Sequence, residues 1–319
     1  MENNDNGTLE PVRCPVCKSD DGLVLDERSS AGKKLRSVIC RRCSHVYLNP
    51  RARQETYDEF YRSGFSLEFN KIDDREGLVA LADSNKAKTA RLLKFITPYI
   101  RPGMRVLEIG AGYGNVLAAL RDDYQAQEVV GIEPDPIGQK VAHEVFGLEL
   151  LPGVLSEHIA RLSDGKFDLI IMHHVLEHFL QPDEVGDALR KLCAEDGAVY
   201  IGVPNICALT VPRNMYFRFP HVQYFSPFSL FLFLRRNGFK VVAHGPFDQP
   251  LTVVAMPFGS TAAQATSWEA AIKTSVPYDK VVSLVKRGHL KQSLRLFVRD
   301  RLKPMIPKKI KLVLKKIVH

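Results

Sequence analysis

The sequence predicts an α/β fold in which a doubly wound parallel sheet follows a small cysteine-rich module. Short apolar runs alternate with helical patterns between residues 104 and 203, and two C-x-x-C pairs precede them. Strands that alternate with helices form parallel sheets with helices on both faces. The chain has 319 residues, 45% of them hydrophobic, which is enough for such a core and a second module.

Residues 1–52 are predicted to form a zinc ribbon. Two residues separate Cys14 from Cys17, and Cys40 and Cys43 repeat this spacing after 22 intervening residues. Four such thiolates can surround one tetrahedral zinc ion at about 2.3 Å and leave no position for water, which indicates a structural metal. His45 is an alternative ligand, but Cys43 is better placed. The residues between the pairs alternate around a Ser-Ser-Ala-Gly turn and predict a hairpin.

Residues 53–82 are predicted to form an aromatic connector. We expect its rings to pack between the two modules, with a substrate platform as the alternative. The rings belong to Tyr57, Phe60, Tyr61, Phe65 and Phe69. A helix is predicted over 84–100, with Ser84 as its cap and Pro102-Gly103 as its stop signal.

The segment 83–258 is predicted to contain the main sheet. Its expected elements are strand 104–109, helix 114–121, strand 128–132, helix 136–146, strand 148–151, helix 155–162, strand 167–172, helix 182–194 and strand 197–203. Ser226 and Pro227 are typical of a helix start, and Gly238 of a helix end. Strands over 239–244 and 251–256 complete a set of seven.

The loop after the first predicted strand contains Gly110, Gly112 and Gly114, within the stretch RVLEIGAGYGNVL. Glycine lets the backbone approach a ligand closely, and the helix that follows directs free N–H groups toward it. Dinucleotide-binding loops place their third glycine three residues after the second, and P-loops require Lys followed by Ser or Thr. The loop fits neither pattern, which disfavours NAD and ATP.

Two carboxylates accompany this loop. Glu108 stands two residues before Gly110, where it favours a cationic group on the ligand. Glu133 follows the second predicted strand, and a carboxylate at that position can accept both hydroxyls of a ribose. The pair therefore indicates a nucleoside ligand.

These motifs resemble those of the class I S-adenosylmethionine-dependent methyltransferases, whose first motif is an acidic residue, an apolar residue and Gly-x-Gly-x-Gly. FDLIIMHHVLEHFLQPDEV (167–185) is similar to the family's fourth strand and following segment, and GAVYIGVPN (197–205) to its fifth strand. Several motifs matching in order are more specific than any single one. The resemblance implies a Rossmann-like seven-stranded sheet with an antiparallel last strand, a methyltransferase domain over 83–258, and S-adenosylmethionine as cofactor.

The resemblance also implies where the cofactor binds. The glycine loop would hold its amino-acid end, Glu133 its ribose, and the backbone near Val154 its adenine, while Glu108 orients the loop or favours the ammonium group. The residues expected at the cofactor are Glu108, Gly110, Ala111, Gly112, Gly114, Glu133, Pro134, Val154 and His173.

Methyl transfer to a neutral hydroxyl requires in-line positioning and a base, for which histidine is best suited. The catalytic candidates are His174, His178 and His221. His174 is the strongest because it lies nearer the strand tip, whereas a structural hydrogen bond is the alternative for His178. In a helix these two would share a face, which also suits a metal, but we expect Glu177 to point elsewhere and identify no third ligand.

His221 lies in the long segment between the fifth strand and the next helix, a region that covers the acceptor pocket in related enzymes. Arg213, Arg218 and Tyr224 accompany it there. They could contact an anionic or sugar acceptor, and simple solvation of loop residues is the alternative.

The net charge of +8 is concentrated in residues 291–319, which contain ten Lys or Arg and one Asp. The first 290 residues together carry −1. An RNA-modifying enzyme would spread basic residues around its site, so the distribution favours a small-molecule or glycan acceptor, excludes DNA and disfavours RNA. Residues 291–319 are predicted to form a basic amphipathic tail that contacts an anionic membrane surface, or else a solvated or self-packing helix, after a linker and helix over 259–290.

The polar N-terminus lacks the features of a signal peptide, and the chain contains no run of the roughly 20 apolar residues that span a membrane. We expect a cytoplasmic protein, with peripheral contact at the inner face of the membrane. Zinc ribbon, core and basic tail together resemble bacterial enzymes of surface-polysaccharide and sugar pathways.

The expected reaction is therefore O-methylation of a sugar, a glycan, or a nucleotide- or lipid-linked small acceptor. One alternative is a ribosomal RNA methyltransferase, since one such group joins a four-ligand zinc site to this core. Another is a nucleotide-sugar C-methyltransferase, although those carry a large C-terminal domain that 319 residues cannot hold. A third is a non-enzymatic adaptor, which the intact glycine and glutamate motifs disfavour.

Overall fold

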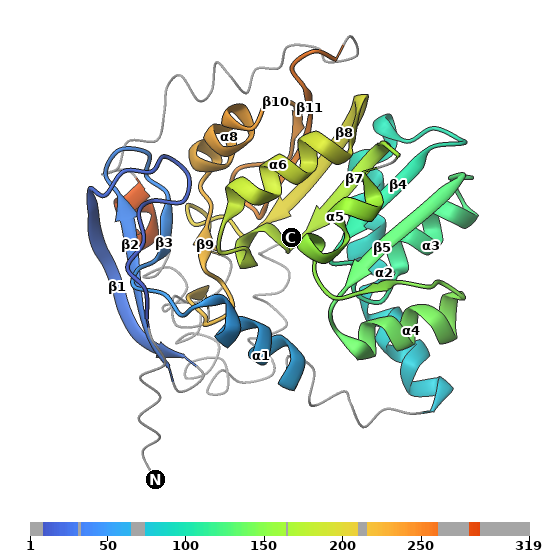
Figure 1. Cartoon of the computed structure of the whole chain (residues 1–319), viewed down its shortest axis with the longest axis horizontal. Coiled ribbons are helices and arrows are strands. Elements are labelled where there is room, and N and C mark those ends of the chain that lie inside the picture. Colours follow the sequence, from blue (N-terminus) through green and yellow to red (C-terminus); the bar gives the residue numbers. More distant parts are fainter. Residues whose placement is uncertain are drawn as a thin grey trace, which may run out of the picture.

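The computed structural model describes residues 9–30, 33–64, 74–163, 165–209, 216–260 and 281–287. Its main sheet has seven strands: β4 (Arg105–Ile109), β5 (Glu128–Glu133), β6 (Leu151–Pro152), β7 (Phe167–His173), β8 (Cys193–Val203), β10 (Phe239–His244) and β11 (Leu251–Pro257). Their order across the sheet is β10-β11-β8-β7-β4-β5-β6 (Figure 1). Strands β4 to β8 pair in parallel, and β11 runs antiparallel to both β8 and β10. The predicted fold class and the antiparallel last strand are confirmed.

Two groups of helices cover the two faces of this sheet. Helices α2 (Arg75–Ile96), α3 (Asn115–Asp122) and α4 (Pro136–Phe146) contact one another. In the other group, α5 (Leu155–Leu162) and α8 (Pro227–Arg236) each contact α6 (Pro182–Leu192). Alternate strand residues belong to different cores: Val106 packs with Leu117 of α3, whereas Leu107 packs in the core that holds Leu189 of α6. The period-two alternation of apolar residues on strands buried on both sides produces this layering.

The first helix of the core begins earlier than predicted. Ser84 does not cap it: Asp74 does, accepting a hydrogen bond from Gly77 N at 2.7 Å. The nine residues before Ser84 stay helical because Leu78 and Leu81 pack with α4. The helix ends at Ile96 and is followed by the 3-10 turn η1 (Thr97–Tyr99).

Two strand boundaries also differ from the prediction. The strand expected over 148–151 is reduced to β6, and the one expected over 197–203 begins at Cys193 as β8. β6 is an edge strand whose pairing with β5 extends over only two residues, so local apolar pattern alone could not place it.

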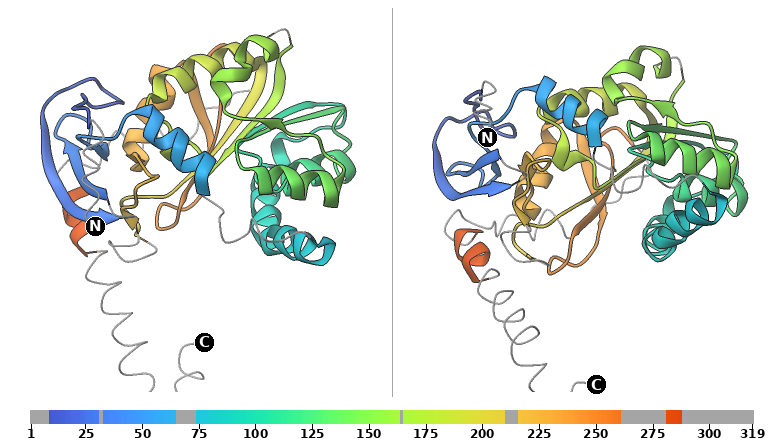
Figure 2. Two further views of the ribbon diagram at one scale, coloured as in Figure 1. Left: turned by 60° about the horizontal axis from the view of Figure 1, so that its bottom comes forward. Right: turned by 90° about the horizontal axis from the view of Figure 1, so that it is seen from below.

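A second, four-stranded sheet contains the cysteine pairs. It comprises β1 (Gly22–Ser30), β2 (Lys33–Cys40), β3 (Val46–Leu48) and β9 (Gln223–Tyr224), in that order. β1 and β2 form the predicted hairpin. We call the described part of residues 1–52 the cysteine module; it lies at one end of the molecule, beside α8 and away from α4 (Figures 1 and 2). Because β9 belongs to the segment between β8 and α8, the sheet joins the module to the core.

Helix α1 (Gln54–Gly64) follows the cysteine module. The ring of Tyr57 stacks on Phe219 with centroids 4.7 Å apart, and Phe60 meets the same ring edge-on at 5.3 Å. These two connector aromatics therefore pack against the segment that carries β9. Phe65, Phe69 and the side chain of Tyr61 lie outside the described residues.

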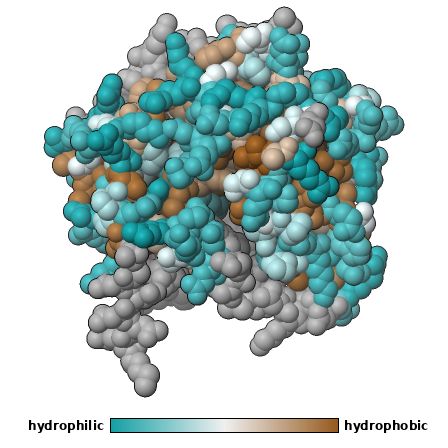
Figure 3. Space-filling model, viewed as in Figure 1, coloured by the Kyte–Doolittle hydropathy of each residue, from teal (hydrophilic) through white to brown (hydrophobic). Residues whose placement is uncertain are grey.

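The C-terminal region is described only over 281–287, a helical stretch whose Val281 and Val285 pack in the same core as Tyr57. The predicted tail, 291–319, and most of the predicted linker lie outside the described residues. Among the helices that the structure describes, none combines the length and apolar character needed to cross a membrane. The face shown in Figure 3 is mainly hydrophilic, with hydrophobic side chains gathered in separate patches.

Candidate active site

A cavity of about 580 Å³ opens at the carboxyl ends of β4, β7 and β8. Its lining includes residues of α2, of the loop after β4 and of the segment after β7, together with Pro204 and residues between 216 and 221. Ligands of doubly wound sheets bind beyond these strand ends, where neighbouring connections diverge. The position marks this cavity as the candidate site.

One wall of the cavity is the glycine loop. Gly110 and Gly112 both have positive φ, +72° and +55°, a conformation that favours glycine. A Cβ at Gly110 would also come within 2.5 Å of Val175, whereas nothing within 4 Å would meet one at Gly112. The loop thus exposes its backbone to the cavity. We call Glu108, Gly110, Ala111, Gly112 and Tyr113, all of which line the cavity, the glycine wall.

Glu108 is a buried carboxylate at this wall, only 3% exposed. Among the described residues, its Oε2 has no hydrogen-bond partner. Burial and the nearby Glu133 raise the pKa of Glu108 well above its usual range. An unpaired buried carboxylate oxygen beside a cavity fits a ligand that brings a cationic donor such as an ammonium group.

Glu133 holds the glycine loop rather than lining the cavity. Its Oε2 accepts a hydrogen bond from Gly112 N at 2.6 Å, and its Oε1 accepts one from Asp135 N at 2.8 Å. Burial raises the pKa of Glu133 to about 7, against the lowering effect of these two N–H donors. Gly114, Pro134 and Val154, also predicted at the cofactor, are not in the cavity lining.

A second part of the cavity lining contains histidines. His173 lines the cavity with its Nδ1 3.1 Å from the hydroxyl of Tyr200, and burial lowers its pKa to about 4. His174 follows with φ +59°, and its N–H donates to Gly202 O at 2.8 Å. A left-handed histidine is strained backbone of the kind that concentrates at functional sites.

The segment after β7 is not an α-helix, so His174 and His178 do not share a helical face. Only the 3-10 turn η2 (Leu176–His178) forms there. The prediction that Glu177 points elsewhere is wrong: its carboxylate is 1% exposed, and its Oε1 lies 3.2 Å from His174 Nδ1. Burial would raise the pKa of Glu177, but the bond with His174 and the nearby His178 and His221 hold it below its usual value.

His178 and His221 complete this group. His178 Nδ1 donates to the carbonyl of Pro220 at 2.9 Å, and the two imidazole rings lie 5.0 Å apart, edge to face. The guanidinium of Arg218 donates to His221 Nε2 at 3.2 Å, and His221 Nδ1 is buried without a partner among the described residues. Burial lowers the pKa of His221 to about 3.

The three predicted catalytic histidines are thus brought together around Glu177. We call His174, Glu177, His178, Arg218 and His221 the histidine wall; all five line the cavity. Tyr224, predicted at the acceptor, is not in the lining, and Arg213 lies outside the described residues.

The cysteine module holds the histidine wall in place. β3 pairs with β9, two residues after His221. The buried His45 Nε2 donates to Gln223 Oε1 at 2.7 Å, and Gln223 Nε2 donates to the carbonyls of Phe179 and Leu180 at 3.1 and 3.3 Å. His45 is therefore a bridge to the segment after His178. Sequence reasoning missed Gln223.

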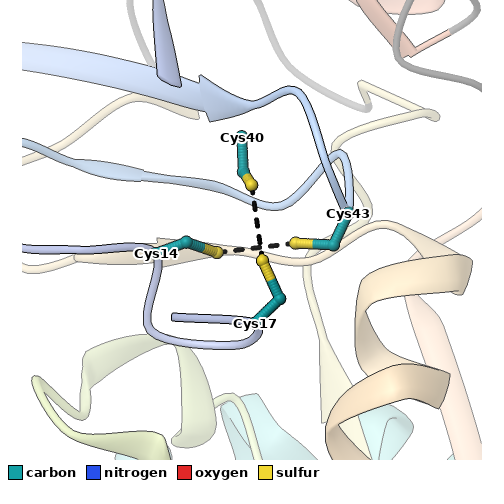
Figure 4. A group of neighbouring side chains, drawn as sticks. All are labelled: Cys14, Cys17, Cys40 and Cys43. Carbon is teal, nitrogen blue, oxygen red and sulfur yellow. Dashed lines mark hydrogen bonds between the residues drawn. The ribbon is translucent and has the colours of Figure 1, made fainter. Parts of the chain in front are cut away.

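The four module cysteines converge on one point (Figure 4). Cys14 Sγ lies 3.5 Å from Cys43 Sγ, Cys17 Sγ lies 3.5 Å from Cys40 Sγ, and all four sulfur atoms are within 4.8 Å of one another. Four sulfurs around a tetrahedral zinc at about 2.3 Å are about 3.8 Å apart. The arrangement fits a closed four-thiolate metal site.

Comparison with known proteins finds a matching protein family. Residues 82–244 match the model of the family Methyltransf_23, described as a methyltransferase domain. Over 113 residues the chain is 32% identical to a ribosomal protein L11 methyltransferase of Thermosipho africanus, covering 34% of this chain and 40% of that protein. It is 23% identical over 227 residues to an uncharacterized 37.1 kDa protein in transposon TN4556 of Streptomyces fradiae, covering 70% and 62%. The chain thus spans less than two thirds of the length of these relatives.

Similar solved structures include a Burkholderia thailandensis 1,6-didemethyltoxoflavin-N1-methyltransferase with bound S-adenosylhomocysteine. Its TM-score is 0.45 at 20% identity, and the match covers 67% of this chain and 95% of that one. The CcbJ methyltransferase from Streptomyces caelestis has a TM-score of 0.46 at 15% identity, covering 63% and 98%.

Proposed function

The chain belongs to the Methyltransf_23 methyltransferase domain family, and from this premise we propose that it transfers a methyl group from S-adenosylmethionine to an oxygen of its acceptor. The acceptor we propose is a sugar, a glycan, or a nucleotide- or lipid-linked small molecule. The observation that carries the proposal is one cavity that both the glycine wall and the histidine wall line.

The glycine wall fits S-adenosylmethionine, whose sulfonium supplies an activated methyl group when bound. Glu108 offers its unpaired oxygen to an ammonium group, and the backbone of Gly112 faces the open cavity. Glu133 is proposed to accept the ribose hydroxyls by exchanging one of its two backbone hydrogen bonds, with Pro134, Gly114 and Val154 shaping the surrounding loops. His173, neutral at neutral pH because its pKa is about 4, borders the same space without adding charge.

The histidine wall supplies a base for an acceptor hydroxyl. His174 is proposed to take the proton on Nε2, because Glu177 lies at its Nδ1 and fixes the tautomer. Its imidazole is about half-exposed, with 45% side-chain accessibility, so an acceptor in the cavity can reach it. His221 is less suited to this role because its low pKa leaves little affinity for a proton.

The cysteine module is proposed to hold structural zinc through Cys14, Cys17, Cys40 and Cys43. The closed thiolate shell leaves no position for a reacting ligand, so the metal stabilises the fold of a module too small for a core of its own. Residues 291–319 are proposed to contact an anionic membrane surface from the cytoplasmic side, near lipid-linked acceptors.

A label-transfer assay tests the proposal. The full chain would be incubated with methyl-labelled S-adenosylmethionine and a panel of glycans, nucleotide sugars and lipid-linked sugars, with ribosomal RNA as a competing acceptor. We expect label in a sugar hydroxyl, and a His174→Asn variant that binds the cofactor normally but transfers slowly. Label appearing in RNA would overturn the acceptor class. Calorimetry showing no binding of S-adenosylmethionine would overturn the enzyme itself.

A further inference from the structure

We propose that Glu177, His178 and His221 form a second metal site, separate from the four cysteines, which holds a divalent transition metal in the histidine wall. One ligand atom from each of the three residues lies within 4.8 Å of the other two. The three come from η2 and from the segment just before β9, and all line the cavity. Two imidazoles and one carboxylate on one side of an open cavity are a donor set typical of Mn²⁺, Fe²⁺, Co²⁺ or Zn²⁺ with positions left for substrate.

Two buried atoms of this group have no partner among the described residues: Glu177 Oε2 and His221 Nδ1. Glu177 is 1% exposed and His221 8%. Buried polar atoms in folded proteins are almost always paired, because an unpaired one loses its hydrogen bonds to water without replacement. A cation between them would satisfy both at once.

The remaining contacts orient the donors as the outer contacts of a metal site do. Glu177 Oε1 is engaged by His174, which leaves Oε2 for a cation. His178 donates its Nδ1 proton to the carbonyl of Pro220, which makes Nε2 its lone-pair nitrogen. Backbone carbonyls commonly orient metal-bound histidines in this way.

Arg218 opposes metal binding at His221. Its guanidinium donates to Nε2, so in this structure the proton of His221 resides on Nδ1. Metal at Nδ1 requires the proton to move to Nε2, where two donors would then face each other. Arg218 must therefore release His221 when the metal binds.

The site would act on the acceptor, and this part rests on the proposed function. Because the three residues line the cavity, a pair of neighbouring hydroxyls could reach a metal held there and bind it through both oxygens. The metal lowers the pKa of a bound hydroxyl. The O–H bond breaks with its proton passing to His174 Nε2, and the oxygen forms a bond to the methyl carbon as the carbon–sulfur bond breaks and its electron pair stays on sulfur. The inferred acceptor class is thus a vicinal diol, as many sugars carry.

The test is Mn²⁺ binding by the full chain with its four cysteines loaded with zinc, followed by electron paramagnetic resonance of free Mn²⁺. Thiolates select zinc over the harder Mn²⁺, so the probe reports on the histidine wall alone. We expect about one Mn²⁺ per chain, and affinity reduced roughly tenfold or more by Glu177→Gln or His221→Asn. Arg218→Leu should strengthen binding. His143→Ala is the matched control, because His143 also pairs with a carboxylate, Glu149 at 2.7 Å, on an exposed surface.

Absence of bound Mn²⁺, or affinity unchanged in both Glu177→Gln and His221→Asn, would overturn the inference. S-adenosylhomocysteine binding by each variant verifies that the variant is folded. If Glu177→Gln does not fold, His221→Asn alone provides the test. Methyl transfer without metal binding would overturn the site and leave the proposed function standing. Metal binding without methyl transfer to any acceptor would support the metal site and overturn the proposed function.

Discussion

The two walls of the cavity are held in place by different means. The glycine wall is built from one continuous stretch, β4 and its loop, braced by Glu133 from the adjacent strand. The histidine wall combines residues near η2 with residues 218–221. The hydrogen bond from His45 to Gln223 braces it from the cysteine module and connects residues 178 positions apart. One wall therefore depends on local backbone geometry, and the other on a module that we propose to fold around a structural zinc ion.

The largest expected effect comes from removing that metal. Cys40→Ser should release zinc and unfold the cysteine module, because structural zinc in small modules contributes about 10–16 kcal/mol. Methyl transfer should fall by more than about 100-fold as the histidine wall loses its brace, while S-adenosylhomocysteine affinity stays within about threefold, since the glycine wall is independent. Zinc content, calorimetry and label transfer measure the three quantities.

Cys193→Ala is the matched control for this experiment. Cys193 begins β8, and the four-cysteine cluster does not include it. Its replacement should leave zinc content intact and methyl transfer close to normal. If Cys40→Ser weakened cofactor binding as strongly as transfer, the two walls would not be independent.

A smaller effect, confined to the other wall, is expected from Glu133→Gln. The two carboxylate oxygens of Glu133 accept hydrogen bonds from Gly112 N and Asp135 N, and the Gln amide has only one such oxygen, without charge. A hydrogen bond to a charged group contributes about 1.5–3 kcal/mol to stability. S-adenosylhomocysteine should therefore bind about 10- to 100-fold more weakly by calorimetry, with the acceptor KM unchanged. Glu128→Gln, an exposed carboxylate at the opposite end of β5 paired with Arg105, should change neither value.

Substitution of Gln223 removes the hydrogen bonds that brace the histidine wall. Gln223→Leu removes the bond partner of His45 Nε2 and of the Phe179 carbonyl, whereas the Leu180 carbonyl keeps its hydrogen bond from Arg51. The expected loss is about 1–3 kcal/mol, enough for a roughly tenfold fall in kcat if His221 is displaced, with cofactor affinity preserved. Gln54→Ala, which removes a solvent-exposed bond to Asp58, controls for loss of a glutamine. A fall in cofactor affinity in place of kcat would contradict a positioning role.

The difference between the two walls also explains which parts of the site the sequence predicts. The β4 strand, its loop and Glu108 were predicted from residues within ten positions of one another, where apolar pattern and glycine spacing carry the information. The cysteine cluster was predicted from spacing alone. In both regions the physical constraint acts along a short stretch of chain.

The histidine wall could be predicted only as a list of residues. Gln223 lies on a two-residue strand, β9, whose partner β3 is far away in the sequence, and no periodicity marks so short a strand. A helical segment would direct Glu177 elsewhere, but a left-handed His174 turns the chain before η2 and brings Glu177 to the histidines. The available signal was composition: one carboxylate directly between histidines at 174 and 178.

The smallest expected effect is a pH dependence confined to the glycine wall. Burial raises the pKa of Glu133 to about 7 from the ordinary 4.5, so the folded chain holds this proton more tightly, and ionising the carboxyl costs stability as the pH rises from 4.5 to 7. In the proposed contact with Glu133, ribose hydroxyls would donate to the ionised form, so binding should weaken as the pH falls through 7. Between pH 8 and pH 6.5 the ionised fraction of Glu133 falls about fourfold, and the affinity for adenosine should fall with it.

Adenosine isolates the ribose contact because it lacks the amino-acid end that Glu108 would meet. Calorimetry at the two pH values should show this change in the wild type and a flat response in Glu133→Gln; an equal slope in both would assign the titration to another group.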